Sequence, residues 1–133
     1  MTRAFPEMKK KLGFGMMRLP MLGETVDYAQ VNDMVDAFLA RGFNYFDTAH
    51  GYIDGKSEEA IGKCLAPRYP RDSYILTNKL SVWYIKSSEE LDTFIENQLK
   101  VCGVDYFDFY LVHAVNKENY VRYKELGCFD AQV

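Results

Sequence analysis

The stretch that decides the fold is Gly42–Gly62, GFNYFDTAHGYIDGKSEEAIG. Its first part, residues 43–46, is a short aromatic run that we interpret as a buried strand ending at Asp47. A loop then carries Tyr52, and Ser57 begins a helix with two acidic residues in its first turn. Strand, loop and helix in this order form a βα unit, and in α/β proteins such strand-end loops carry the chemistry.

Apolar strands and amphipathic helices alternate along the rest of the chain. The expected strands are residues 12–17, 43–47, 74–79 and 106–113. The expected helices are one capped by Thr25 and ended by Gly42, one over 57–65, and one that opens with a capping box at Ser87–Glu90 and ends at Gly103. Residues 116–126 have weaker helical character. This alternation predicts an α/β fold with a parallel sheet and right-handed crossovers.

Three polar residues at the ends of the expected strands, and a glycine in the first strand, recur at a regular interval. Gly15, Asp47, Lys79 and His113 follow one another at intervals of 32, 32 and 34 residues. One βα unit takes roughly 30 residues or more, so each interval fits one unit. We therefore expect Asp47, Lys79 and His113 to stand at the same height, at the carboxyl ends of three neighbouring strands.

Composition narrows the class of protein. A length of 133 residues, 48% hydrophobic and 26% charged, suits one globular domain spanning residues 1–133. The net charge of −3 gives no general attraction to nucleic acid or to an anionic membrane, and no apolar run reaches the roughly 18 residues that a membrane span needs. The three cysteines form no metal-ligand spacing, and His50 and His113 lack a third ligand, so we expect no metal site. These features predict a cytoplasmic protein with reduced thiols.

Four side chains form a set with a common chemistry: Asp47, Tyr52, Lys79 and His113. A phenol has a pKa of about 10, too high for ready proton exchange at neutral pH. A nearby ammonium group, here that of Lys79, favours the phenolate and makes a phenol a better general acid. Asp47 keeps the ammonium charged, and His113 can donate a hydrogen bond to the same substrate oxygen. Together the four side chains would polarise and protonate a carbonyl oxygen. Each residue alone is more often structural, and it is the joint pattern that favours a site.

The chain resembles the aldo-keto reductases, NAD(P)H-dependent enzymes built as (β/α)8 barrels, in three ordered motifs: GFNYFDTAHGY…SEEAIGKCL, ILTNKL and DFYLVHA. The resemblance runs from Leu12 to about Asp130. It implies the N-terminal half of a TIM barrel, with four parallel strands and three or four helices. Asp47, Tyr52, Lys79 and His113 match the family's catalytic tetrad, in which Tyr52 would be the proton donor.

The resemblance also implies a cofactor and a substrate. They are NADPH and a small-molecule carbonyl compound, which would be reduced to an alcohol. The first strand and the loop after it, LGFGMMRLP, resemble the segment near the nicotinamide, so Gly15, Met16, Met17 and Asp47 are the expected cofactor contacts. This segment also resembles the branch of the family whose members often carry a C-terminal ferredoxin-like iron–sulfur module.

The length of the chain departs from the family. A whole barrel needs about 250 residues, whereas 133 residues supply four strands, and the family places most contacts to the cofactor phosphates in the other half. The site would then be complete only in a longer parent or in an assembly. The alternative is a catalytically inactive half-barrel that acts as an oligomeric or binding protein. A four-strand sheet cut from a barrel leaves two open edges, which predicts a homodimer or a higher homo-oligomer.

Overall fold

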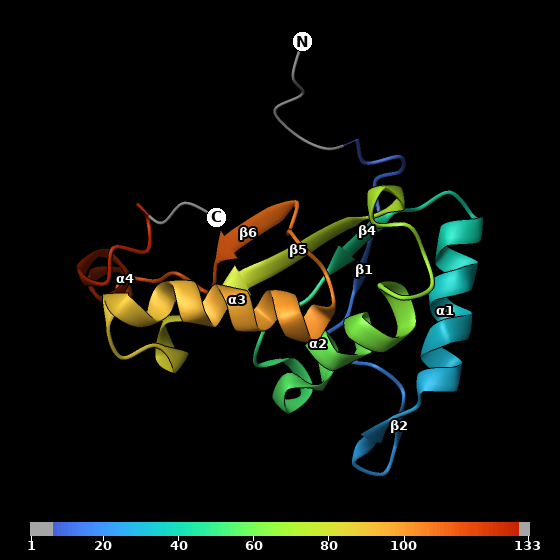
Figure 1. The fold of residues 1–133 in the computed structure, drawn as a ribbon, viewed down its shortest axis with the longest axis horizontal. Coiled ribbons are helices and arrows are strands. Elements are labelled where there is room, and N and C mark those ends of the chain that lie inside the picture. The colour runs from blue at the N-terminus through green and yellow to red at the C-terminus, as the bar shows by residue number, and fades with distance from the viewer. Residues whose placement is uncertain (1–6, 131–133) are drawn as a thin grey trace.

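The protein, a computed structural model, is described over residues 7–130. Four parallel strands form one sheet in the order β1-β4-β5-β6. Their bounds are Gly13–Gly15, Tyr45–Asp47, Ile75–Leu80 and Phe109–Val112. The strands are shorter than the expected runs, but their order and direction are those predicted for half of a (β/α)8 barrel. Figure 1 shows the helices that precede β6 along one side of the sheet and the last helix beyond the tips of β5 and β6.

The helices follow the predicted places, with differences at their ends. Their bounds are α1 Tyr28–Ala40, α2 Lys56–Ala60 with a π-helical continuation over Ile61–Leu65, α3 Leu91–Cys102 and α4 Tyr120–Glu125. Gly42 and Gly103 follow α1 and α3 with positive φ angles of 86° and 69°, which explains why both helices end there. Glu90 reaches back to the backbone amide of Lys86, while Ser87 makes no capping hydrogen bond.

The segment between β1 and α1 was wrongly predicted. No strand was predicted between the strand expected over residues 12–17 and the helix that Thr25 was expected to cap. Instead β2 (Met21–Leu22) and β3 (Thr25–Val26) pair as a small antiparallel hairpin that projects from the body of the molecule (Figure 1). The cap is Asp27, whose carboxylate accepts a hydrogen bond from the Gln30 amide. Gly23, with φ 65°, supplies the tight turn that makes the hairpin possible.

The main core lies between the sheet and its helices. Phe46 and Leu76, both fully buried, project from β4 and β5 toward this layer. Rings from three elements meet there, since Phe14 lies 5.5 Å from Phe46 and 5.4 Å from Phe38 between ring centroids. A side chain at Gly62 would collide with the carbonyl oxygen of Val101, so the glycine lets the helical segment after α2 lie directly against α3.

The segment after β6 packs against a second, smaller core beside α3. This core consists of Leu80, Val82, Ile85, Leu91, Tyr123, Leu126 and Cys128. Tyr123 of α4 is fully buried, and its hydroxyl bonds three backbone groups: the carbonyls of Leu80 and His113 and the amide of Val82. The carboxyl ends of β5 and β6 are thereby joined to each other and to α4.

The other face of the sheet is more open. It carries Tyr45, Thr77, Phe109 and Leu111, and the Leu111 side chain is 46% exposed. Tyr45 and Phe109 lie 6.2 Å apart across β5, and Thr77 donates to the Tyr45 hydroxyl. This face would point into the interior of a closed barrel.

The predicted equal height of the strand-end residues needs a correction. The hydrogen-bond register pairs Gly15 with Asp47, Asp47 with Thr77, and Lys79 with Leu111. Lys79 therefore stands two residues beyond the register position of Asp47, and His113 two residues beyond Leu111. A stagger of this kind accompanies the tilt of strands in a barrel, and it still brings the side chains together.

Candidate active site

An ion pair between β4 and β5 forms the base of the candidate site. The Nζ of Lys79 lies 2.8 Å from the Oδ2 of Asp47 and 2.8 Å from the carbonyl oxygen of Thr48. The Lys79 residue is only 8% exposed. A buried ammonium needs a counter-charge and further acceptors, and here both come from the end of the neighbouring strand. The sequence indicated Asp47 as this partner but gave no sign of the Thr48 carbonyl.

Tyr52 lies directly over this ion pair. The Lys79 Nζ is 4.7 Å from the centroid of the Tyr52 ring, a distance typical of a cation–π contact. The ring of His113 meets the Tyr52 ring edge-on, with 6.0 Å between centroids. All four predicted catalytic residues are thus brought together by contacts within one small region.

The loop that carries Tyr52 has an unusual backbone. Ile53, Asp54 and Gly55 follow one another with φ angles of 51°, 52° and 88°. Left-handed backbone is uncommon for residues other than glycine and costs about 1–2 kcal/mol for an ordinary side chain. Such strain persists only where the surroundings hold it in place. A groove of about 320 Å³ adjoins this loop, lined by His50, Asp54, Gly55 and Tyr84.

His113 is held at the end of β6 by a partner that the sequence interpretation missed. The hydroxyl of the buried Ser81 lies 2.9 Å from the His113 Nδ1. If this hydroxyl donates, the ring proton lies on Nε2, where it can be donated to a substrate oxygen. Burial lowers the pKa of His113 from its ordinary value, and the Lys79 ammonium lowers it further, while Asp47 opposes the shift. The imidazole is therefore held neutral near pH 7.

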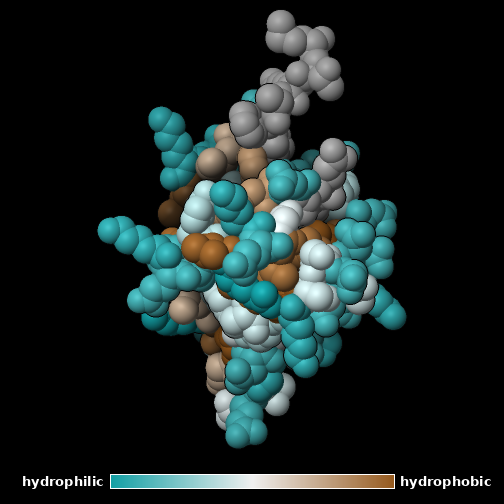
Figure 2. Space-filling model, turned by 90° about the vertical axis from the view of Figure 1, so that its left-hand side faces the viewer, coloured by the Kyte–Doolittle hydropathy of each residue, from teal (hydrophilic) through white to brown (hydrophobic). Residues whose placement is uncertain are grey.

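Aromatic side chains stand beside His113. Trp83 lies 5.1 Å from the His113 ring and is 53% exposed, and Tyr84 next to it is 46% exposed. Residues 79 and 81 are two apart in extended backbone, and this period of two could have indicated from the sequence that Ser81 lies on the same side as Lys79. Trp83 follows in a 3-10 turn over Val82–Tyr84, where this period does not apply. Figure 2 views the molecule from the end toward which β5 and β6 point, and there hydrophobic residues are set among hydrophilic ones.

The expected cofactor contacts near β1 do not all face the same way. Gly15 is exposed, and a side chain built there would meet nothing within 4 Å. Met17 is 53% exposed, whereas Met16 is fully buried in the main core. Gly15 and Met17 are therefore accessible at the end of β1, whereas the Met16 side chain is not, because it packs on the helix side.

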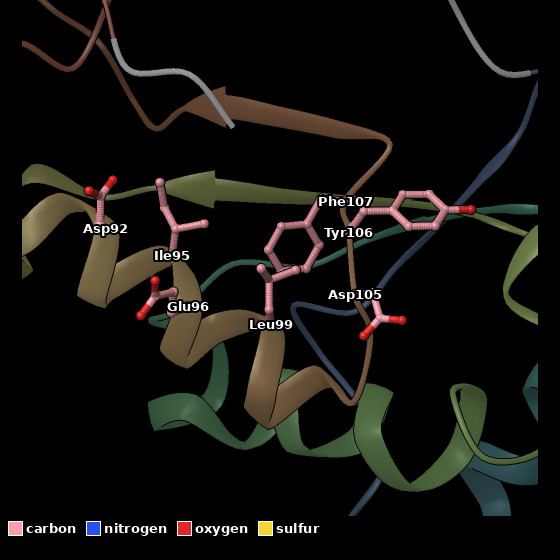
Figure 3. Close-up of a pocket in the computed structure, with 7 residues that line it drawn as sticks. All are labelled: Asp92, Ile95, Glu96, Leu99, Asp105, Tyr106 and Phe107. Carbon is pink, nitrogen blue, oxygen red and sulfur yellow. The ribbon is translucent and has the colours of Figure 1, made fainter.

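A separate groove lies on the helix side of the sheet. It has a volume of about 240 Å³ and is lined by Asp92, Ile95, Glu96, Leu99, Asp105, Tyr106 and Phe107 (Figure 3). Its floor is apolar and its rim carries three carboxylates. None of the four predicted catalytic residues lines it, so it is not part of the candidate active site.

Two negative findings concern residues 7–130. Within that range, no group of three or more His, Cys, Asp or Glu side chains is arranged to hold a metal ion. The same range contains no helix with the length and apolar character required to cross a membrane.

Comparison with known proteins decides the family. The model of the aldo/keto reductase family matches residues 11–129. The chain belongs to this family. The match extends over nearly all of the described residues and includes Asp47, Tyr52, Lys79 and His113.

Individual proteins are similar to this chain over most of its length. A norsolorinic acid reductase of Aspergillus flavus is 30% identical in an alignment of 125 residues that covers 84% of this chain and 32% of the relative. An NADP(+) aryl-alcohol dehydrogenase of Phanerodontia chrysosporium is 34% identical over 89 residues, 63% of this chain and 23% of the relative. An aldo/keto reductase from Klebsiella pneumoniae, solved with NADP and acetate, matches with a TM-score of 0.63 at 27% identity and covers 88% of this chain and 41% of that structure.

These matches confirm that the fold is part of a (β/α) barrel. They also show that the chain spans about a third of the length of the norsolorinic acid reductase and less than half of the Klebsiella reductase.

Proposed function

We propose that this protein is an NADPH-dependent oxidoreductase that reduces a carbonyl group to an alcohol, with a site completed by a longer parent chain or by an assembly. The observation that supports this most directly is the contact of Lys79 with both Asp47 and the ring of Tyr52, beside His113. The likeness to a reductase solved with NADP supports a nicotinamide cofactor.

The four side chains have complementary roles in this proposal. When bound, the reduced nicotinamide supplies a hydride to the carbonyl carbon. Tyr52 donates the proton to the carbonyl oxygen, and the Lys79 ammonium stabilises the phenolate that remains. His113 donates a hydrogen bond from Nε2 and orients the same oxygen, while Asp47 holds the ammonium in place. The cofactor side would be formed by Gly15, Met17 and Asp47, with only the backbone of Met16.

The surroundings of His113 favour an aromatic carbonyl substrate. Trp83 and Tyr84 present exposed rings next to the group that would orient the carbonyl oxygen. Aromatic faces bind planar rings in offset or edge-on contact. The name of the Phanerodontia relative, an aryl-alcohol dehydrogenase, agrees with this choice.

The test is NADPH oxidation, followed at 340 nm with benzaldehyde, for the full product of the gene. We expect turnover that is lost in Tyr52→Phe and retained in Tyr120→Phe, an exposed tyrosine of α4. Absence of turnover in the wild type with several aromatic and aliphatic aldehydes would contradict the proposed activity.

For the 133-residue chain by itself, we propose a second function, which a different experiment tests. Among residues 7–130, β1 and β6 are the edge strands of the sheet, and Leu111 is exposed on the inner face. These features support an inactive half-barrel that binds a second copy of itself. We expect a homodimer by light scattering at low micromolar concentration, and no NADPH binding at about 100 μM, detected through emission of the single tryptophan, Trp83. A monodisperse 15.4 kDa monomer would contradict the dimer.

The proposal also includes the location of the protein in the cell and its membership of the iron–sulfur branch of the family. The three cysteines are free and buried, which supports a reducing compartment such as the cytoplasm. The iron–sulfur branch rests on the motif LGFGMMRLP alone, and iron analysis of the full gene product tests it.

A further inference from the structure

A buried carboxylate connects the loop that carries Tyr52 with the strand β5 that carries Lys79. Glu58, in the first turn of α2, is only 1% exposed. One of its oxygens lies 2.7 Å from the Nδ1 of His50, and the other lies 2.7 Å from the Nδ2 of Asn78. A buried carboxylate is costly unless its oxygens are hydrogen-bonded, and here each oxygen has its own partner.

Each partner of Glu58 is adjacent to a residue of the proposed site. His50 lies two residues before Tyr52, in the loop with the left-handed backbone. Asn78 directly precedes Lys79, and its Oδ1 accepts a hydrogen bond from the Lys79 amide. The Lys79 carbonyl in turn accepts from the buried Gln98 of α3. The backbone of Lys79 is thus held from both sides by amide side chains, one of which Glu58 fixes.

The loop has a second, weaker tie to the same helix turn. Thr48 and Ser57 are fully buried, and their hydroxyl oxygens lie 2.7 Å apart. Inside the loop, the amides of Tyr52 and Asp54 donate to the carbonyls of Ala49 and Gly51. These two amides therefore report on whether the loop is closed.

We infer that Glu58 is a positioning residue, which keeps the strained Tyr52 loop in register with Lys79 through His50 and Asn78. An ionised carboxylate only accepts hydrogen bonds, so the His50 ring carries its proton on Nδ1 and donates it. This role of Glu58 rests on the proposed function, because the residues that it would position, Tyr52 and Lys79, belong to the proposed site. The contacts themselves, and the test below, do not depend on catalysis.

The test is amide hydrogen exchange, resolved by NMR, on the 133-residue chain. In Glu58→Ala we expect the amides of Tyr52 and Asp54 to exchange about ten- to a hundredfold faster, because hydrogen bonds to a charged group are lost from the loop. Amides in the centre of α3 should keep their protection. The matched control is Glu59→Gln, since Glu59 is an exposed neighbour in the same turn.

A second variant keeps the test valid if Glu58→Ala does not fold. In Glu58→Gln the amide can still accept from Asn78 and can donate to an unprotonated His50 Nδ1. We expect the His50 proton to move to Nε2, visible in the imidazole ¹⁵N and ¹³C shifts, with only two histidines to distinguish. Unchanged shifts, or faster exchange spread evenly over β5 and α3, would overturn the inference. The absence of NADPH turnover would bear only on the proposed function.

Discussion

The two sides of the candidate site are held in place by different means. On the Tyr52 side, a loop with left-handed backbone is tied to α2 by buried side chains, above all Glu58. On the His113 side, the end of β6 is bonded to Ser81 and to the phenol of Tyr123. Because the first support is local and the second joins two strands to a helix, we expect damage on the Tyr52 side to stay local. Damage on the His113 side should lower the stability of the whole domain.

The largest effect is expected at Lys79, which lies on β5 and forms the ion pair with Asp47 of β4. Lys79→Met removes the ammonium that contacts Asp47 and the Tyr52 ring. General acid catalysis is worth about a hundredfold to ten-thousandfold, so we expect NADPH-dependent turnover in the full gene product to fall by about a hundredfold or more. Lys63→Met, a change at an exposed lysine, is the control. Equal turnover in the two variants would exclude the role of Lys79.

The next effect concerns the His113 side alone. Tyr123→Phe removes one hydroxyl and leaves three backbone groups without that partner. An unsatisfied buried polar group costs about 1–3 kcal/mol, so we expect a loss of that size in urea unfolding. Emission of Trp83, next to Val82, should shift as well. Tyr120→Phe on the same helix, where the ring is 48% exposed, should change neither quantity. If both variants are equally stable, α4 does not anchor the strand ends.

The pH dependence of stability distinguishes the two histidines. The pKa of His113 is lowered in the folded protein below its ordinary value of 6.5. Between the two values the unfolded chain binds more protons than the folded one, so stability should fall as the pH drops through this range. We expect His113→Gln to flatten this part of the curve of unfolding free energy against pH. If this slope is the same in wild type and in His113→Gln but changes in His50→Gln, the pH dependence of stability comes from His50 on the Tyr52 side and the prediction for His113 is wrong.

The smallest effect tests the backbone of the Tyr52 loop. Asp54 is exposed and has φ 52°. A β-branched residue is poorly tolerated in this region, so Asp54→Val should destabilise the domain by about 1 kcal/mol. Asp54→Gly should be neutral or slightly stabilising, because glycine adopts this conformation without strain. Thermal unfolding measures both, and a less stable glycine variant would mean that the left-handed turn does not form.

The sequence predicted what depends on local pattern and on the period of the βα unit. The parallel sheet, the helix ends at Gly42 and Gly103, and the meeting of Asp47 with Lys79 all follow from such signals. The hairpin before α1 was missed because its strands are only two residues long, and Asp27, not Thr25, turned out to be the cap. The roles of Ser81 and Tyr123 depend on contacts between residues far apart in the chain, such as Tyr123 with Leu80, which no local pattern encodes.

Gly62 has a consequence for the tolerance of this domain to mutation. The residue is not one of the candidate site residues and lies where the segment after α2 touches α3. Any side chain there would push α3 outward, and α3 carries Gln98, which holds the Lys79 carbonyl. In a library of random variants selected for function, position 62 should therefore accept glycine alone. The choice of residue at position 62 would be as restricted as at Lys79, although Gly62 has no side chain that could take part in the proposed reaction.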